Sequence, residues 1–152
     1  FGSLPMFEDG DYRLCQGPVI LSYIAHQHKV APNDPQLRSK ADAITWGAED
    51  LRTQYFKLFG DNSNEKQSEF LAGDWRTRWL PSLNGLLELN GNTGYFVGAS
   101  LTHADIAMWD VLNAFEEYIP DADMDGYPQL QAFYESISER PPIASYLASR
   151  QT

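Results

Sequence analysis

The pattern of apolar and polar positions divides the chain into a short β segment and a longer helical part. Two short runs, residues 6–8 and 11–15, flank the dipeptide Asp9-Gly10. Asp-Gly favours a hairpin because glycine adopts the positive φ that a tight turn requires. The sequence therefore predicts a two-stranded hairpin. Since an isolated hairpin is only marginally stable in water, a helix or further strands must pack against it.

A first helix is predicted after Gly17. Pro18 suits the first helical position, where its missing N–H has no cost. His26 and His28 follow two residues apart, which places them on different sides of a helix, whereas a helical metal pair is spaced by three or four. Both histidines are therefore interpreted as solvent-exposed residues at the helix end. The apolar face of this helix consists of Val19, Ile20, Tyr23 and Ile24.

The segment 29–33 (KVAPN) is interpreted as a linker, and everything after it has helical periodicity. Asp34-Pro35 supplies a cap followed by a first-turn proline. A long amphipathic helix of about two dozen residues follows, well above the average length, so it is expected to pack along most of the domain. Its apolar stripe has spacings of four and three residues and consists of Leu37, Ala41, Ile44, Ala48, Leu51, Tyr55 and Leu58.

Further helices are predicted toward the C-terminus. Residues 61–64 (DNSN) break the long helix, and residues 65–90 form a second one, in which Pro81 produces a kink by removing a backbone donor. After a turn and a short extended stretch, another helix begins at the cap described next. Residues 127–137 form a last helix, and the segment 140–150, which opens with Arg-Pro-Pro, gives only a short final turn.

The segment LTHAD at 101–105 predicts a helix start. The Thr102 side chain can accept from the N–H of Asp105, while the Asp105 carboxylate accepts from the N–H of Thr102, which is a capping box with Asp in place of Glu. The helix that follows is apolar on nearly all sides and is therefore predicted to be central and buried. Its apolar residues include Ile106, Ala107, Trp109, Val111, Leu112 and Phe115.

Asp110 lies within this apolar helix. A carboxylate in such a setting is either a catalytic group or a buried acid held by neighbouring backbone or hydroxyl groups. The second interpretation is favoured, because buried polar groups in proteins are generally hydrogen-bonded.

Composition and charge exclude several classes of protein. The chain has 152 residues and a formal net charge of −10, with a pI near 4.5. General affinity for nucleic acid or for an anionic bilayer is excluded, because both depend on Lys and Arg. Cys15 is the only cysteine and cannot form an internal disulfide, which favours a cytosolic or organellar-matrix location. The most apolar stretch, 19–25, falls far short of the roughly 20 residues of a membrane span, and neither a transmembrane nor a signal segment is expected.

Several segments together resemble a known family. They are FGSLPMFEDGDYRLCQGPVIL at 1–21, GAEDLR at 47–52, GYFVGASLTHADIAMWDVL at 94–112, and the YPQL and SERPPIASYLAS stretches. In order and spacing they resemble the cytosolic glutathione transferases, particularly the pi, sigma and related tyrosine-type classes. The resemblance implies a mostly α fold, an all-α glutathione transferase C-terminal bundle preceded by the hairpin-plus-helix half of a thioredoxin-like α/β domain. The implied boundaries are 1–28 for the partial thioredoxin-like domain, 29–33 for the linker and 34–152 for the bundle.

The resemblance also implies a segment before Phe1. Family members begin with a thioredoxin-like βαβ unit, which takes about 30 or more residues, and the sequence enters at the loop before the third strand. That unit contains the hydroxyl-bearing residue that hydrogen-bonds the glutathione sulfur in these classes. The catalytic residue is therefore expected upstream of Phe1, and no residue of the chain is assigned that role.

The resemblance implies a glutathione site built from separate segments. Leu4 would bind the cysteinyl moiety through backbone groups beside Pro5, which is usually cis in the family. Gln16 and Gly17 stand where the family has Gln-Ser, which holds the γ-glutamyl carboxylate, so Gly17 lacks a hydroxyl. Asp50 matches the acid that reaches across the dimer to the γ-glutamyl amine. Without the resemblance, Leu4-Pro5 would be a strand entry and Asp50 a solvated acid.

Two further contacts are implied. Phe56, Phe59 and Gly60 lie where the family's long helix lines the electrophile pocket, although aromatic residues there are otherwise core residues. Gly60 replaces a tyrosine that is frequent in pi-class enzymes, so their substrate preferences do not transfer. Phe1 stands in the place of an aromatic key that enters a pocket between two helices of the other subunit, which implies a homodimer.

Two functions are compatible with these residues. The preferred one is a cytoplasmic detoxification enzyme that conjugates or isomerises small hydrophobic electrophiles with the thiolate of glutathione, its cosubstrate, without a metal. The intact Leu4-Pro5, Gln16 and Asp50 favour this interpretation. The alternative is a non-catalytic scaffold or assembly subunit of the same fold, which Gly17 and the absent upstream unit favour. Neither function involves nucleic acid or membrane insertion.

Overall fold

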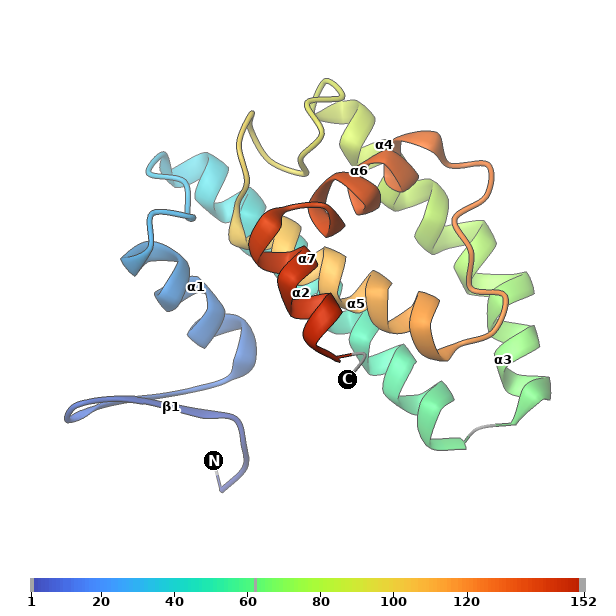
Figure 1. Ribbon diagram of the computed structural model, residues 1–152, viewed down its shortest axis with the longest axis horizontal. Helices are drawn as coiled ribbons and strands as arrows, with labels where there is room; N and C mark the ends of the chain where they lie inside the picture. Colours follow the sequence, from blue (N-terminus) through green and yellow to red (C-terminus); the bar gives the residue numbers. More distant parts are fainter. Residues whose placement is uncertain (1, 62, 151–152) are drawn as a thin grey trace.

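The computed structural model describes residues 2–61 and 63–150, and Phe1, the predicted dimer key, lies outside them. A two-stranded hairpin precedes a set of helices (Figure 1). α3, η1 and α4 follow one another without a break, and residues 90–102 connect α4 to α5. Their bounds are β1 Met6–Asp9, β2 Tyr12–Cys15, α1 Gly17–Gln27, α2 Pro35–Asp61, α3 Asn64–Phe70, the π-helix η1 Leu71–Trp79, α4 Leu80–Leu89, α5 His103–Tyr118, α6 Pro128–Ser138 and α7 Pro141–Arg150.

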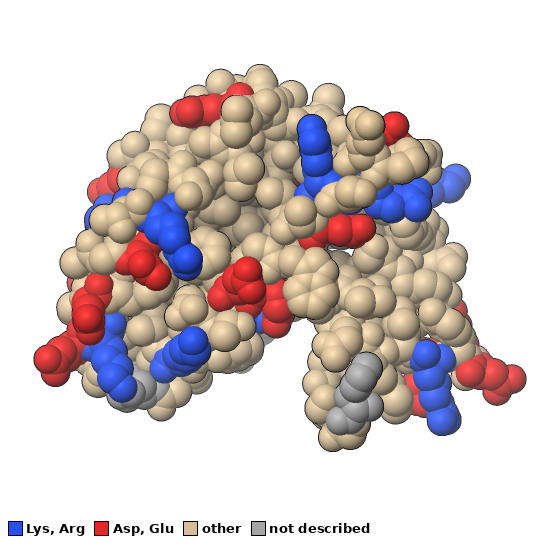
Figure 2. All heavy atoms as spheres, turned by 180° about the vertical axis from the view of Figure 1, so that it is seen from behind, with Lys and Arg blue, Asp and Glu red and all other residues tan. Residues whose placement is uncertain are grey.

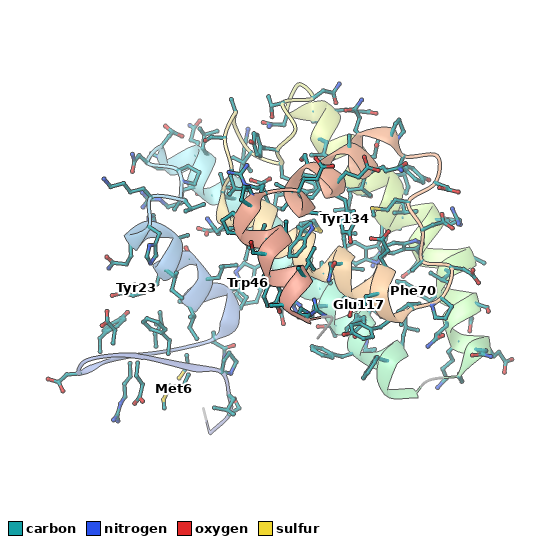
Figure 3. All side chains as sticks on the ribbon, viewed as in Figure 1. Met6, Tyr23, Trp46, Phe70, Glu117 and Tyr134 are labelled. Atoms are coloured by element: carbon teal, nitrogen blue, oxygen red, sulfur yellow. The ribbon has the colours of Figure 1, made fainter. Side chains whose placement is uncertain are left out.

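The hairpin packs on α1 through an aromatic cluster. β1 and β2 pair antiparallel around the turn at Gly10, whose φ is +59°. Tyr23 of α1 faces the hairpin, with its ring centroid 5.7 Å from that of Phe7 and 5.1 Å from that of Tyr12 (Figure 3). The predicted hairpin is thus confirmed, and α1 is the helix that covers it.

The core of the bundle lies between α2 and α5, which pack along each other. Most of the α2 stripe predicted from the sequence is buried, and α5 is buried over most of its length, as predicted for a central helix. Aromatic rings fill the core near the C-terminal end of α5, where Trp75 stacks on Phe115 with centroids 4.8 Å apart. The buried apolar residues of α5 are Ala104, Ala107, Met108, Trp109, Val111, Leu112 and Phe115.

The helical run predicted over 65–90 is present, but its distortion lies elsewhere than expected. The non-helical backbone is at Gly73, with φ −90° and ψ −108°, inside the π-helical segment. Pro81 falls in the first turn of α4, where its missing N–H is tolerated. The N–H of Leu80 donates to the carbonyl of Trp75, an i to i−5 bond, so the wider π turns precede the proline. The predicted kink at Pro81 was therefore wrong.

Two other predictions need correction. Asp110 is not buried: it is exposed and forms an ion pair with Arg52 of α2, Oδ2 to Nη1, at 2.8 Å. The apolar residues that surround Asp110 in the sequence of α5 did not indicate that this position is exposed. The predicted final short turn is a ten-residue helix, α7. Its start at Pro141 is compatible with a helix because proline is favoured at the first helical position.

The hairpin and α1 stand at one end of the molecule, and the remaining helices form the other (Figure 1). Seen from behind, the surface is hollowed between these two parts, and acidic and basic side chains are intermixed over it (Figure 2). Within the described residues, no helix has both the length and the apolar character needed to cross a membrane.

Candidate functional site

The two N-terminal segments predicted to bind glutathione lie next to each other. The peptide bond between Leu4 and Pro5 is cis, and the Leu4 side chain is 87% exposed. A Cβ built on Gly17 would lie 3.9 Å from Cγ of Pro5, an ordinary van der Waals contact. The loop before β1 and the first residue of α1 therefore form one surface, and a side chain at position 17 would fit there without a clash.

The start of α1 has the properties of an anion site. Gln16 leaves β2 with φ +75°, and its carbonyl accepts the N–H of Ile20 at 2.9 Å. No side chain caps this helix, and its first turn contains no acidic residue. Pro18 has no N–H, so the N–H groups of Gly17 and Val19 are the ones in this turn without a helical partner, and they lie at the positive end of the helix dipole.

The other predicted site residues lie on α2. Asp50 is exposed. Phe56 and Phe59 are 60% and 53% exposed, so they form an aromatic surface at the end of α2 and not part of the core. Phe59 stacks on Tyr55 with centroids 5.6 Å apart and meets the edge of Tyr118 at 6.0 Å.

A cavity of about 520 Å³ lies between α1, α2, α5 and α7. Gly17 contributes to it, whereas Phe56, Phe59 and Gly60 do not. Its wall is mainly apolar, with a polar rim formed by Arg52 and its ion-pair partners Glu49 and Asp110. The other residues that line it are Pro18, Leu21, Thr45, Ala48, Ile106, Ala107, Trp109, Pro142, Ile143 and Tyr146.

The buried carboxylate of the bundle belongs to Asp105, which is 0% exposed. Thr102 and Asp105 form a capping box at the start of α5. Oδ2 of Asp105 accepts the backbone N–H of Thr102 at 2.7 Å and its hydroxyl at 2.9 Å, and Oδ1 accepts the N–H of Phe96 at 2.8 Å. Burial raises the pKa of Asp105, and these hydrogen bonds act in the opposite direction. The carboxylate thus connects the 95–98 segment to α5 and does not face a cavity.

A second buried polar group was not identified from the sequence. His103 is 0% exposed, and its Nε2 lies 3.1 Å from Oδ1 of Asp42 on α2. The hydroxyl of Ser22 on α1 donates to the same oxygen at 3.3 Å. The backbone N–H of His103 donates to the carbonyl of Val30 at 3.0 Å. This Ser22–Asp42–His103 network joins α1 to the bundle.

His26 and His28 are exposed at the end of α1. In the part of the chain that the structure describes, no group of three or more His, Cys, Asp or Glu side chains is arranged to hold a metal ion.

Comparisons with known proteins agree on one family. Residues 49–150 match the model described as "Glutathione S-transferase, C-terminal domain". The chain is 32% identical to Glutathione S-transferase P 1 of Bufo bufo, over 98% of this chain and 70% of the relative. The glutathione S-transferase of Ascaris lumbricoides superimposes with a TM-score of 0.83 at 29% identity, over 99% of this chain and 75% of the other. The fold is also that of the Onchocerca volvulus Pi-class enzyme, with a TM-score of 0.87 at 23% identity, over 99% and 72%.

A thioredoxin-like hairpin and helix next to an all-α bundle, with a cis-proline loop beside a helix N-terminus, define the glutathione transferase class of fold. The chain belongs to the glutathione S-transferase family. Both solved structures superimpose on nearly the whole of this chain.

Proposed function

We propose that the protein is a cytosolic glutathione transferase that conjugates or isomerises small hydrophobic electrophiles with the thiolate of glutathione. The observation that supports this most directly is that Pro5 lies close to Gly17, since a Cβ built on Gly17 would be 3.9 Å from Cγ of Pro5. It joins the cis-proline loop, whose backbone groups can pair with a peptide, to a helix N-terminus that attracts a carboxylate. Glutathione presents a peptide backbone and a carboxylate in the same molecule.

Each part of glutathione then has a proposed partner. The backbone of Leu4 pairs with the cysteinyl moiety beside Pro5, and Gln16 with the start of α1 at Gly17 holds the γ-glutamyl carboxylate. The partner subunit's Asp50 binds the γ-glutamyl amine. Phe56, Phe59 and Gly60 form the proposed electrophile surface, where the exposed rings offer an apolar, aromatic wall.

The hydroxyl that activates the thiol is expected upstream of Phe1, so the experiments below use the full-length protein. The proposed organisation is the partial thioredoxin-like unit at 1–28, the linker at 29–33 and the bundle at 34–152. The proposed reaction uses no metal, and the proposed role is detoxification.

Glutathione binding is the experiment that tests this function. Calorimetry is expected to give saturable binding to the wild type, and Gly17→Ser is expected to lower the dissociation constant about tenfold, because the new hydroxyl donates to a carboxylate, a bond worth about 1.5–3 kcal/mol. A Cβ at position 17 would make only an ordinary van der Waals contact, with Cγ of Pro5 at 3.9 Å. Gly17→Ala is the matched control, since it adds the Cβ without the hydroxyl.

No heat at millimolar glutathione with either the wild type or Gly17→Ser would reject the enzyme and favour the scaffold alternative. Equal affinities of Gly17→Ser and Gly17→Ala would mean that the backbone alone binds the carboxylate.

The proposed homodimer uses a hollow between α2 and α4. This hollow, about 290 Å³, includes Ile44, Leu86 and Leu89, and Leu89 is 85% exposed. An apolar side chain so exposed is suited to contact with a second chain. The predicted aromatic key, Phe1, lies outside the described residues, and this hollow is its proposed recipient in the other subunit.

Leu89→Asp is expected to raise the dimer dissociation constant at least about tenfold, because burying an unpaired charge opposes association. Sedimentation equilibrium of the full-length protein measures this. Since Leu89 is exposed, the variant is expected to keep the circular dichroism spectrum of the wild type, and an unchanged dimer would remove this hollow from the interface.

A further inference from the structure

The tripeptide Leu-Asn-Gly occurs twice in the chain, around Asn84 and around Asn90, and the structure places the two copies differently. Asn84-Gly85 lies inside α4, where Asn84 is buried. Asn90 ends α4, and Gly91 begins the exposed turn that follows, with φ +76°. An asparagine followed by glycine loses its side-chain amide most readily, because glycine presents an unhindered backbone nitrogen on a flexible backbone.

The side-chain amide of Asn90 holds the loop that follows α4. Its Nδ2 lies 2.7 Å from the carbonyl oxygen of Gly98, 2.9 Å from that of Tyr95 and 2.8 Å from Oγ1 of Thr93. Its Oδ1 accepts the N–H of Gly98 at 3.1 Å. The hydroxyl of Thr93 also donates to the carbonyl of Gly98, at 2.7 Å. One amide group therefore connects both ends of the 93–98 loop to the end of α4.

A carboxylate at position 90 would weaken this loop. It would still accept the N–H of Gly98, but it would turn a negatively charged oxygen toward the two carbonyl oxygens that Nδ2 now faces. It would also stand at the C-terminal end of α4, where the helix dipole disfavours negative charge. The loop carries Phe96, which is buried and whose N–H donates to Oδ1 of Asp105 at 2.8 Å, so a loosened loop affects the core.

We propose that Asn90 is a modification site, at which spontaneous deamidation releases the 93–98 loop, whereas Asn84 is protected by its helix. The backbone nitrogen of Gly91 attacks Cγ of Asn90, and the new N–C bond closes a five-membered succinimide. The bond between Cγ and Nδ2 breaks, and ammonia leaves with the proton of the Gly91 nitrogen. Water then hydrolyses the ring and gives aspartate or isoaspartate. The reaction consumes one water molecule and needs no enzyme or cofactor.

Opening of the turn controls the rate of this reaction. The N–H of Gly91 donates to the carbonyl of Glu88 at 2.9 Å, and Nδ2 of Asn90 is held by its acceptors, so both reacting groups must first be released. A local opening of this kind requires less free energy than global unfolding. The amide of Asn84 donates to Oε1 of Glu88 at 2.7 Å and accepts the N–H of Leu130 at 3.2 Å. Its reaction therefore requires α4 to unfold.

The experiment is incubation of the full-length protein at physiological temperature and mildly alkaline pH, followed by peptide mass spectrometry. Aspartate or isoaspartate is expected to form at position 90 at least about tenfold faster than at position 84 in the folded protein, and equally fast at both in urea. Thr93→Val removes a partner of the Asn90 amide and is expected to raise the rate at position 90 several-fold. Thr77→Val is the matched control, because its hydroxyl donates to the carbonyl of Gly73 in η1, and it is expected to leave that rate unchanged.

Asn90→Asp reproduces one product of the reaction and is expected to lower the urea midpoint of unfolding. The wild type is expected to lose stability during incubation in proportion to the fraction modified at position 90. An Asn90 that stays intact in the folded protein while the urea-unfolded chain reacts would overturn the inference, and so would equal rates at positions 84 and 90 in the folded protein. Equal urea midpoints for Asn90→Asp and the wild type would overturn the role of this amide in holding the loop.

Discussion

Replacement of Asp105 by alanine is expected to lower the free energy of unfolding by about 3 kcal/mol or more, because each buried N–H left without an acceptor costs about 1–3 kcal/mol. The carboxylate accepts from the N–H groups of Phe96 and Thr102 and from the Thr102 hydroxyl. Phe96 and Thr102 are each 4% exposed, so water cannot replace the lost acceptor.

Urea unfolding measures this loss, and Thr102→Val is the matched variant. Valine keeps the backbone N–H and the shape but removes the hydroxyl, so its cost is expected to be smaller, about 0.5–2 kcal/mol as for other capping residues. Equal urea midpoints for Asp105→Ala and the wild type would mean that these hydrogen bonds do not stabilise the fold.

The same variant gives a pH test. Burial raises the pKa of Asp105 above its value in the unfolded chain. The carboxyl group therefore binds its proton more tightly in the folded protein than in the unfolded chain. The stability that this group contributes is therefore fully present below its unfolded pKa, about 4, and decreases as the pH rises through the folded pKa. The difference in unfolding free energy between the wild type and Asp105→Ala is expected to narrow over that interval.

The features that the sequence predicted well depend on neighbours a few residues apart. In the Asp9-Gly10 turn and in the Thr102–Asp105 capping box, the interacting residues are at most a few positions apart. The apolar stripe of α2 repeats along one face of a single helix. The kink predicted at Pro81 was wrong because the energetic cost of its missing N–H depends on the conformation of the preceding turn. That turn is π-helical. Asp110 was misjudged because a run of apolar residues does not show which position of the helix is exposed and paired with a residue of another helix, here Arg52 of α2.

The residues of the candidate site also differ in whether a local sequence pattern could identify them. Leu4-Pro5 and Gln16-Gly17 could be selected from motifs, but their contact depends on the hairpin that brings the chain back. Arg78 lines the same hollow as Asp50, between α2 and η1, and no local signal in the sequence indicates that the two share it. His103 and Asp42 are 61 positions apart, and a histidine at the start of an apolar helix indicates a buried partner without identifying it.

The buried imidazole of His103 and the carboxylate of Asp42 are expected to depend on each other for their contributions to stability. Its Nδ1 is buried with no hydrogen-bond partner in the described part of the chain, whereas Nε2 faces the Asp42 carboxylate. A hydrogen on Nε2 and none on Nδ1 is the arrangement that leaves no buried donor unpaired. Asp42 then serves as the acceptor of this N–H and also of the Ser22 hydroxyl.

Asp42→Ala is therefore expected to cost about 2 kcal/mol of unfolding free energy, because it leaves the Nε2–H of His103 buried without an acceptor. His103→Phe is expected to cost less, since Asp42 is half-exposed and can be solvated. Adding His103→Phe to Asp42→Ala is expected to recover most of the loss, because two apolar groups leave no donor unsatisfied. Urea midpoints of the two single variants and the double variant measure this cycle. Strictly additive losses would show that Asp42 and His103 do not form the contact that joins α2 to the start of α5.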